Sequence, residues 1–284
     1  MALPGIAVIF MFYYMPMFGL VVAFKNFNYS DGVWGSAWVG FENFRFLFNQ
    51  PGFISTIWNT LFIATMKLIG GIIVPVSFSL LLNEITNSRV RRAFQTIIYI
   101  PNFISWVIMA GLLLDILSFN GIANRALTFV GVGPVSFLGN AKIFPWTMII
   151  SDIWKTFGFG TVVYLATLAA INPGLYESAM VDGAKRWKQT VYITIPMMMP
   201  IIILMTVLSL GNILNAGFDQ IYNLYAPIVY ETGDVIDTYV YRLSFHNAQY
   251  SIGTAVGMFK SLVSGILIIT SYFLADKLAG YRVF

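Results

Sequence analysis

The sequence predicts an all-α membrane protein with six transmembrane helices, because of its composition and the length of its apolar stretches. Of the 284 residues, 58% are hydrophobic and 10% are charged, whereas about 25% of the residues of a typical soluble domain are charged. Such a chain has too little polar surface to cover a water-soluble globule. Six stretches approach or exceed the roughly 20 apolar residues that a spanning helix needs. They are Leu3–Phe24, Ile57–Leu82, Phe94–Leu117, Ile143–Ala170, Pro200–Ala216 and Gly253–Ala275.

The first stretch begins beside the N-terminus, with no basic segment before it. A cleaved signal peptide has such a segment, so the stretch is expected to be a spanning helix. The five that follow are not interrupted by a tandem repeat, a low-complexity tract or a long linker. Residues 1–284 are therefore expected to form a single transmembrane domain.

Six crossings place both termini on one side of the membrane, and the basic residues indicate which side. If the termini and loops 84–92 and 172–196 are cytoplasmic, that side holds eight of these basic residues and the other side five. This asymmetry agrees with the positive-inside rule and predicts cytoplasmic termini. The cytoplasmic set is Arg89, Arg91, Arg92, Lys185, Arg186, Lys188, Lys277 and Arg282, and the outer set is Lys25, Arg45, Arg125, Lys142 and Arg242.

The loop 172–196 has its own signals for a helical hairpin. Asn172 can cap a helix that begins at Pro173, and Gly183 can supply the left-handed conformation that ends it. A second short helix is expected over 184–192, before Pro196 opens the next span. The alternative is a surface hairpin that only joins two spans.

This loop resembles a known motif. Glu177-Ser178-Ala179, Asp182-Gly183-Ala184 and Ile193-Thr194-Ile195-Pro196 follow the pattern EAAxxDGAxxxxxFxxIxLP of permease subunits of binding-protein-dependent ABC importers, with intact spacing over 20 positions. Ser178, Thr190 and Ile195 depart from the pattern, and Thr190 removes an apolar anchor that Trp187 or Val191 can replace.

The resemblance extends to the carbohydrate branch of this family, and within it to permeases for oligo- and polysaccharides such as those of alginate importers. The segments that carry this similarity are 151–155, 157–159, 215–222, 238–242 and 280–284.

The resemblance implies that the hairpin couples the membrane domain to a cytoplasmic ATPase. Glu177 is expected to meet a basic residue of that ATPase, Gly183 to allow close backbone approach, and the small Ala179 and Ala184 to pack into its groove. The full set expected at this contact is Glu177, Ala179, Asp182, Gly183, Ala184, Lys185, Arg186 and Trp187.

The same family implies a bacterial inner-membrane complex. Its expected partners are a second permease, distinct or identical, two ATPase subunits that bind ATP and Mg²⁺, and an extracytoplasmic solute-binding protein. This chain has no Walker A motif, since Gly253–Ser261 has the wrong spacing and lies in an apolar stretch. It is expected to carry no cofactor of its own.

Other classes of function fit the residues poorly. The chain has no cysteine and one histidine, His246, which leaves no thiolate site, no histidine-based metal site and no catalytic constellation for a membrane enzyme. Its basic residues form no long run or aromatic-interleaved patch, so nucleic-acid binding is not expected. A secondary transporter is the remaining alternative, but it predicts inverted repeats and leaves the hairpin motif unexplained.

Polar residues within the apolar stretches are candidates for the substrate pathway, because charges at membrane depth usually face a cavity or a partner. Lys67, Asp152, Lys155 and Lys260 are the charged ones. Asp152 and Lys155 are three residues apart and can pair with each other. Asn212, Asn215 and Asp219 are expected to share one face of the fifth helix, where they can bind sugar hydroxyls or another helix.

These residues also bear on the charge of the substrate. Three lysines against one aspartate in the apolar stretches favour an acidic saccharide, whose carboxylates need positive charge along the way. A neutral oligosaccharide, bound by amides and aromatic rings, is the alternative.

Overall fold

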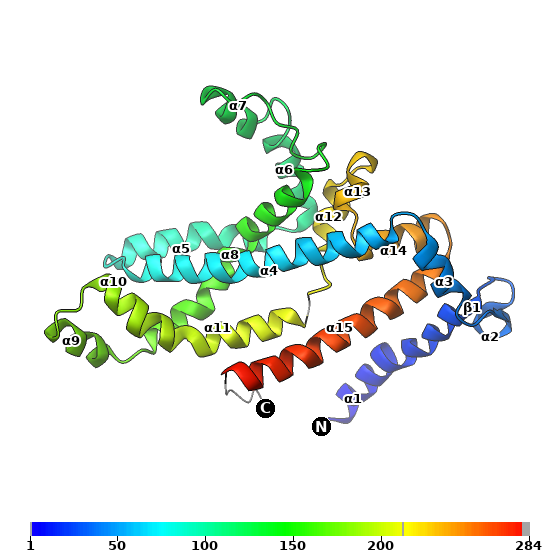
Figure 1. The fold of residues 1–284 in the computed structure, drawn as a ribbon, viewed down its shortest axis with the longest axis horizontal. Helices are drawn as coiled ribbons and strands as arrows, with labels where there is room; N and C mark the ends of the chain where they lie inside the picture. Colours follow the sequence, from blue (N-terminus) through cyan, green and yellow to red (C-terminus); the bar gives the residue numbers. More distant parts are fainter. Residues whose placement is uncertain (1, 212, 280–284) are drawn as a thin grey trace.

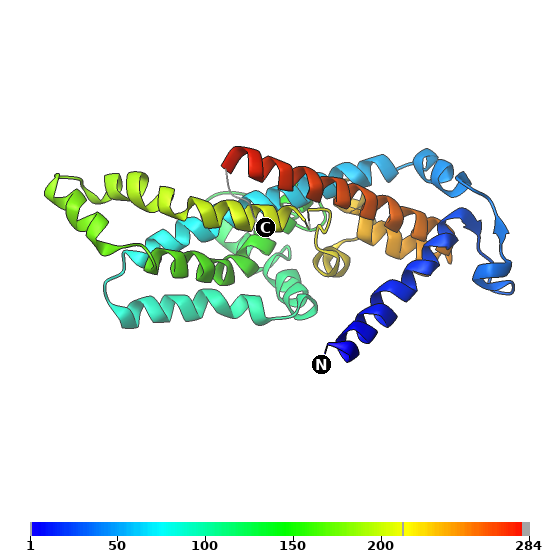
Figure 2. The same cartoon turned by 90° about the horizontal axis from the view of Figure 1, so that it is seen from below.

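The computed structural model of the chain describes residues 2–211 and 213–279 and is almost entirely helical. Its long helices run roughly along one axis (Figures 1 and 2). Four segments are long and apolar enough to cross a membrane, and there are up to six if two bent helix pairs each count as one span. The four segments are Leu3–Phe24, Phe53–Asn83, Arg186–Leu210 and Tyr250–Thr270. The predicted all-α class is confirmed.

The N-terminal part forms the first span and then a small cap. The span is one helical run of α1 (Leu3–Ile9), the π-turn η1 (Phe10–Tyr14) and the 3₁₀ segment η2 (Met15–Phe24). The cap consists of β1 (Lys25–Asn26), α2 (Gly32–Gly35), β2 (Ala37–Trp38) and α3 (Glu42–Asn49). β1 and β2 pair antiparallel, with Lys25 opposite Trp38. Lys25 fixes this cap, because its ammonium donates to the carbonyls of Val33 and Trp34.

The central part contains the longest helices. Its elements are α4 (Phe53–Asn83), α5 (Ser88–Phe103), α6 (Trp106–Ile116), α7 (Ile122–Phe129) and α8 (Phe144–Ala169). The expected span Phe94–Leu117 is sharply bent, because α5 and α6 meet at 105°. Ile104 is extended, and the hydroxyl of Ser105 accepts from the N–H of Ile108 and so begins a new helix.

The C-terminal part also contains a broken helix. Its elements are α9 (Pro173–Val181), α10 (Arg186–Gln189), the π-turn η3 (Thr190–Thr194), α11 (Ile195–Leu210), α12 (Phe218–Leu224), η4 (Pro227–Val229), α13 (Tyr230–Gly233), α14 (Ile236–Tyr241), the π-turn η5 (Arg242–His246) and α15 (Tyr250–Ala279). The expected fifth span Pro200–Ala216 is wrong at both ends. Its helix begins at Arg186 and ends at Leu210, and the described residues that follow, 211 and 213–217, are not helical and form what we name the break.

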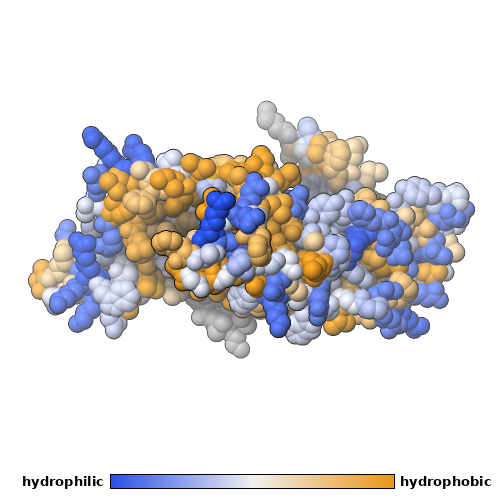
Figure 3. Space-filling model, turned by 90° about the horizontal axis from the view of Figure 1, so that it is seen from above, coloured by the Kyte–Doolittle hydropathy of each residue, from blue (hydrophilic) through white to orange (hydrophobic). Residues whose placement is uncertain are grey.

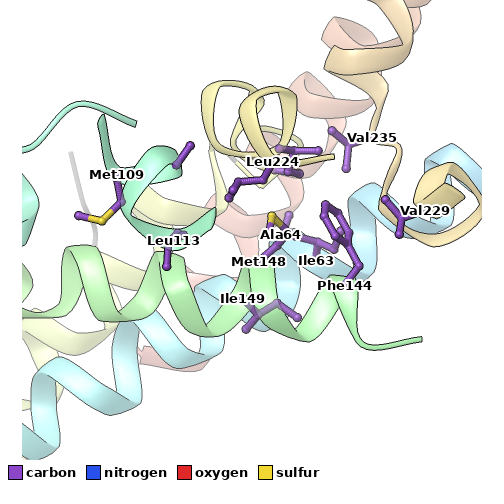
Figure 4. Packing of buried hydrophobic residues seen from close by; sticks show 13 residues of the cluster. Ile63, Ala64, Met109, Leu113, Phe144, Met148, Ile149, Leu224, Val229 and Val235 are labelled. Atoms are coloured by element: carbon purple, nitrogen blue, oxygen red, sulfur yellow. The ribbon is translucent and has the colours of Figure 1, made fainter. Parts of the chain in front are cut away.

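The largest core joins the middle helices to α12. Phe144 and Met148 of α8 pack with Ile63 of α4, and Leu224 of α12 and Met109 of α6 complete the cluster (Figure 4). A second core holds α3, α4, α14 and α15 together through Leu47, Phe53, Ile236, Tyr239 and Val256. The break therefore lies beside well-packed helices.

The molecule has two distinct ends. We name the end that carries α9 and α10 the hairpin end, and the opposite end, with β1, α2 and α3, the cap end (Figure 1). α6 and α7 project sideways from the bundle between them. Hydrophobic side chains cover much of the middle of the molecule, and hydrophilic ones gather toward both ends (Figure 3). Loops 84–88 and 170–186 share one end, as the charge distribution requires.

Close helix packing at Gly158 gives a test of this fold. A Cβ at Gly158 of α8 would overlap the carbonyl oxygen of Ile98 on α5, so the two helices approach as closely as glycine permits. Gly158→Ala is expected to destabilise the chain by about 1–3 kcal/mol and to lower its melting temperature in detergent by about 2–6 °C. Gly71→Ala is the matched control, because no atom lies within 4 Å of its added Cβ. Equal melting temperatures of the two variants would contradict this packing.

Candidate functional site

The first half of the hairpin folds as its sequence predicts. The side-chain oxygen of Asn172 accepts from the N–H of Gly174 at 2.9 Å and caps α9. At the other end, Gly183 has a φ of +76°, and the N–H of Ala184 donates to the carbonyl of Ala179 at 2.9 Å. Both the cap and the glycine stop are confirmed, because each depends only on neighbouring residues.

The second half differs from the expectation. The separate helix over 184–192 is wrong, since α10, η3 and α11 form one uninterrupted helix, Arg186–Leu210. The wider π-turn over Thr190–Thr194 precedes Pro196 and allows the chain to remain helical through a residue that lacks an N–H. A rigid helix therefore connects the hairpin directly to the middle of the molecule.

Most of the expected coupling residues lie on the surface of the hairpin. Glu177, Asp182, Gly183, Lys185, Arg186 and Trp187 are exposed, whereas Ala179 and Ala184 are half-buried. The hydroxyls of Tyr176 and Thr194 are 3.0 Å apart and join the two arms. Arg186 also donates to the carboxylate of Glu84 at 2.6 Å, which connects the hairpin to the end of α4. The hairpin thus presents a fixed, accessible surface to a partner.

Lys67 of α4 lies at the centre of a buried polar network. Its ammonium donates to the carbonyl of Ala216 at 2.7 Å and to the side-chain oxygen of Gln220, and lies 3.5 Å from the carboxylate of Asp152. The amide nitrogen of Gln220 donates in turn to the carbonyl of Met148 and to the hydroxyl of Ser151. The network joins α4 and α8 to the break between α11 and α12.

Lys155 does not pair with Asp152, so the expected ion pair is wrong. Its ammonium donates to the carbonyl of Asn102 at 3.1 Å and lies 5.2 Å from the ring centre of Trp106. A cation is favourable at the C-terminal end of a helix, where carbonyls lack intrahelical partners. Lys155 therefore stabilises the bend between α5 and α6, and Lys67 replaces it as the partner of Asp152.

The expected stripe of Asn212, Asn215 and Asp219 on one helix is also wrong. Asn215 lies in the break and Asp219 in α12, while Asn212 falls outside the described residues. Gly217, with a φ of +95°, turns the chain between Asn215 and Asp219. The side-chain oxygen of Asn215 accepts from Lys260 of α15 at 2.7 Å, and Lys260 also contacts the carboxylate of Asp237 at 2.5 Å.

A polar pocket of about 370 Å³ opens beside these contacts. Lys67, Asp152, Ser209 and Asn215 supply its polar lining, and Leu68, Leu208 and Ile213 are among its apolar residues. The pocket lies against the middle of α4, between the two ends of the molecule. Hydroxyl, amide and carboxylate groups on an apolar wall are the groups that orient a small polar ligand. Of the expected pathway residues, the structure brings Lys67, Asp152 and Asn215 to this pocket, with Lys260 at its edge, and leaves Lys155 and Asp219 out of its lining.

Comparison with known proteins identifies the family. Residues 71–281 match the family model described as "Binding-protein-dependent transport system inner membrane component". The chain belongs to this family. It is a multi-pass permease of a bacterial ABC importer, a transport subunit rather than an enzyme, and ATP is hydrolysed by a partner subunit.

The permease is similar to proteins with named substrates. It is 38% identical over 278 residues to the Polygalacturonan/rhamnogalacturonan transport system permease protein YteP of Bacillus subtilis, covering 98% of this chain and 87% of that protein. It is 36% identical over 276 residues to Protein LplB of the same organism, covering 97% and 87%. A chain in a crystal structure of a bacterial ABC transporter that imports the acidic polysaccharide alginate is 42% identical, with a TM-score of 0.90 and coverage of 97% and 93%.

A second structure describes a related assembly. It is a crystal structure of a bacterial alginate ABC transporter in complex with an alginate pentasaccharide-bound periplasmic protein. The matched chain is 41% identical to the permease, with a TM-score of 0.90 and coverage of 99% and 94%.

Sequence reasoning missed three residues of these networks. Gln220 is fully buried and bridges Lys67 to α8, and Glu84 and Asp237 pair with Arg186 and Lys260. Among the described residues, no group of three His, Cys, Asp or Glu side chains could hold a metal ion. The signal that the sequence offered was a cation, Lys67, and an anion, Asp152, in separate apolar stretches. Their pairing depends on the tertiary fold, which helical spacing does not reveal.

The buried pair predicts a double-variant cycle. Lys67→Met leaves Asp152 without its cation and is expected to destabilise the permease by about 3 kcal/mol, because an unpaired charge remains inside the bundle. Lys67→Met with Asp152→Leu is expected to recover the part of this loss that the unpaired carboxylate causes, but not the part due to the lost hydrogen bond to the carbonyl of Ala216. Thermal unfolding in detergent measures both. If the double variant is no more stable than the single one, the two side chains are not coupled.

Proposed function

We propose that the permease forms half of an import pathway for acidic oligosaccharides of the uronate type. The observation that carries this proposal is the similarity, at 38–42% identity over nearly the whole chain, to permeases named for polygalacturonan and alginate. Both of those polymers have a carboxylate on their sugar rings. Permeases named for neutral sugars are less similar, such as the galactooligosaccharide permease GanP of Bacillus subtilis at 28%.

The excess of lysines does not support this proposal as the sequence suggested. Lys67 and Lys260 each have a carboxylate partner, and Lys155 binds a backbone carbonyl. The charge of each lysine is thus largely compensated by its surroundings. The polar pocket supports a saccharide ligand without fixing its charge, because Asp152, Ser209 and Asn215 can bind sugar hydroxyls. We propose Lys67, Asp152, Asn215 and Lys260 as pathway residues at or beside this pocket, together with Asn212.

The proposal extends to the other subunits of the importer and to the orientation of the permease in the membrane. A second permease completes the pathway, two ATPase subunits bind at the hairpin end, and an extracytoplasmic binding protein delivers the saccharide to the cap end. Both termini lie in the cytoplasm, as the basic residues favour. The residues 177–187 meet the ATPase, and motion of its subunits moves the hairpin and the attached helix Arg186–Leu210 as a rigid body.

Substrate class can be tested in the reconstituted importer. Binding protein loaded with a uronate oligosaccharide is expected to raise the ATPase rate and to drive uptake into vesicles. A neutral oligosaccharide of the same length is the matched control and is expected to give neither response. Stimulation by the neutral sugar alone would favour the alternative substrate and overturn the acidic one.

The coupling role can be tested at the hairpin. Glu177→Lys reverses a charge on the exposed face of α9, and Gly183→Pro forbids the φ of +76° that the turn requires. Each variant is expected to remain in the membrane and to lower stimulated ATPase activity and uptake at least tenfold. Glu231→Lys, an exposed carboxylate near α14, is the matched control and should retain activity. Wild-type stimulation in both hairpin variants would exclude the coupling role.

A further inference from the structure

An aromatic surface lies on α12, α14 and η5, next to the polar pocket. We define it by four side chains, Phe218, Tyr222, Tyr241 and Phe245. The ring centres of Phe218 and Tyr222 are 5.3 Å apart, those of Tyr222 and Tyr241 4.8 Å, and those of Tyr241 and Phe245 5.2 Å. Each ring contacts the next, so the four form an unbroken series.

These rings are not part of the hydrophobic core. The three clusters of buried residues in the described chain do not include any of the four. Phe218, Tyr222 and Tyr241 are half-buried, and Phe245 is 69% exposed. Exposed aromatic faces in a contiguous group usually bind something. Here the rings mainly support one another and leave a surface free.

The aromatic surface continues into the polar pocket. Asp237 is one turn before Tyr241 on α14 and contacts Lys260, which donates to Asn215 in the lining of the pocket. Phe218 follows Asn215 by three residues, across Gly217. The series of rings thus leads from the exposed Phe245 to the polar groups beside Lys67.

We propose that Phe218, Tyr222, Tyr241 and Phe245 form a track on which the pyranose rings of an oligosaccharide stack while it moves toward the polar pocket. This proposal deepens the proposed function and rests on it. The C–H faces of a sugar pack on aromatic rings, while its hydroxyls remain free for water or polar side chains. Stacking needs no fixed sequence of hydrogen bonds, so a chain can advance along the rings one sugar at a time.

The hydroxyl groups of the track suit an acidic ligand. A tyrosine phenol is neutral at physiological pH, and a hydrogen bond with Tyr241 raises the pKa of Tyr222 further. Neutral rings do not repel a carboxylate, and they do not trap it as a free cation would. The aromatic track can therefore bind a sugar that carries a carboxylate, whereas the pocket binds the polar groups of the sugar.

The test compares loss of the ring with loss of the hydroxyl in the complete importer. Tyr222→Leu and Tyr241→Leu keep an apolar side chain without an aromatic face, and each is expected to lower the maximum uptake rate of a tetrasaccharide about threefold. The double Leu variant is expected to lower it about tenfold. Tyr222→Phe and Tyr241→Phe keep the ring and are expected to retain the wild-type rate. Binding-protein-stimulated ATPase activity should stay within twofold of wild type in all of them.

Phe245→Leu is a further test of the track, and Phe129→Leu is the control for loss of an exposed aromatic ring elsewhere on the chain. Phe245→Leu changes an exposed side chain on which folding does not depend, and should reproduce the threefold loss. Phe129→Leu changes a 93% exposed ring on α7 and should have no effect. Wild-type uptake in the Leu variants, or equal losses in the Phe and Leu variants, overturns the track. Loss of the second permease on purification of the Leu variants also overturns it, because the rings would then be a subunit interface.

The failure of the track can be told from the failure of the proposed substrate. If the wild-type importer takes up only a neutral oligosaccharide, the acidic substrate is wrong, and the same variants then test the track with the neutral sugar. If the wild type imports the uronate and the Leu variants do so equally well, only the track is wrong.

Discussion

The interaction on which the centre of the molecule depends is the hydrogen bond from Lys67 to the carbonyl of Ala216. Irregular backbone is tolerated at membrane depth only where protein or enclosed water satisfies its polar groups. Between Leu210 and Phe218 the helix is interrupted, and Lys67 supplies a donor at this position. Asp152 balances its charge, and Gln220 extends the network to α8. In the described part of the chain, every buried side-chain polar atom has a partner.

The same physical rule explains the other intramembrane lysines. Lys155 binds the end of α5 at the bend, and Lys260 binds Asn215 in the break. Lys67 and Lys155 each bind a backbone carbonyl where a helix is interrupted, and Lys260 binds the side chain of Asn215 in the break. Three cations in apolar stretches therefore identify broken helices better than they identify an anionic ligand. This accounts for the failure of the charge excess as a guide to substrate, although the substrate class itself is supported by the relatives.

The success of sequence reasoning followed the range of the interactions. The cap at Asn172 and the turn at Gly183 involve residues within a few positions, and both were predictable. The bend after Phe103 and the break after Leu210 interrupt runs that are mostly apolar, so hydropathy alone extends the helix across them. The pairing of Lys67 with Asp152 joins residues 85 positions apart on α4 and α8. Helical spacing favoured Lys155 instead, because it compares only residues on one helix.

In the proposed function, the uninterrupted helix Arg186–Leu210 connects the hairpin to the break. It begins at the hairpin formed with α9 and ends at the break, where Asn215 lines the pocket. A helix of 25 residues is about 38 Å long. A displacement of the hairpin therefore reaches the break without an intervening loop. At the break, the contacts that can change are the few polar ones to Lys67 and Lys260, since the hydrophobic cores on either side are close-packed. In the proposed function, access to the pocket therefore changes at the break, where the backbone is interrupted.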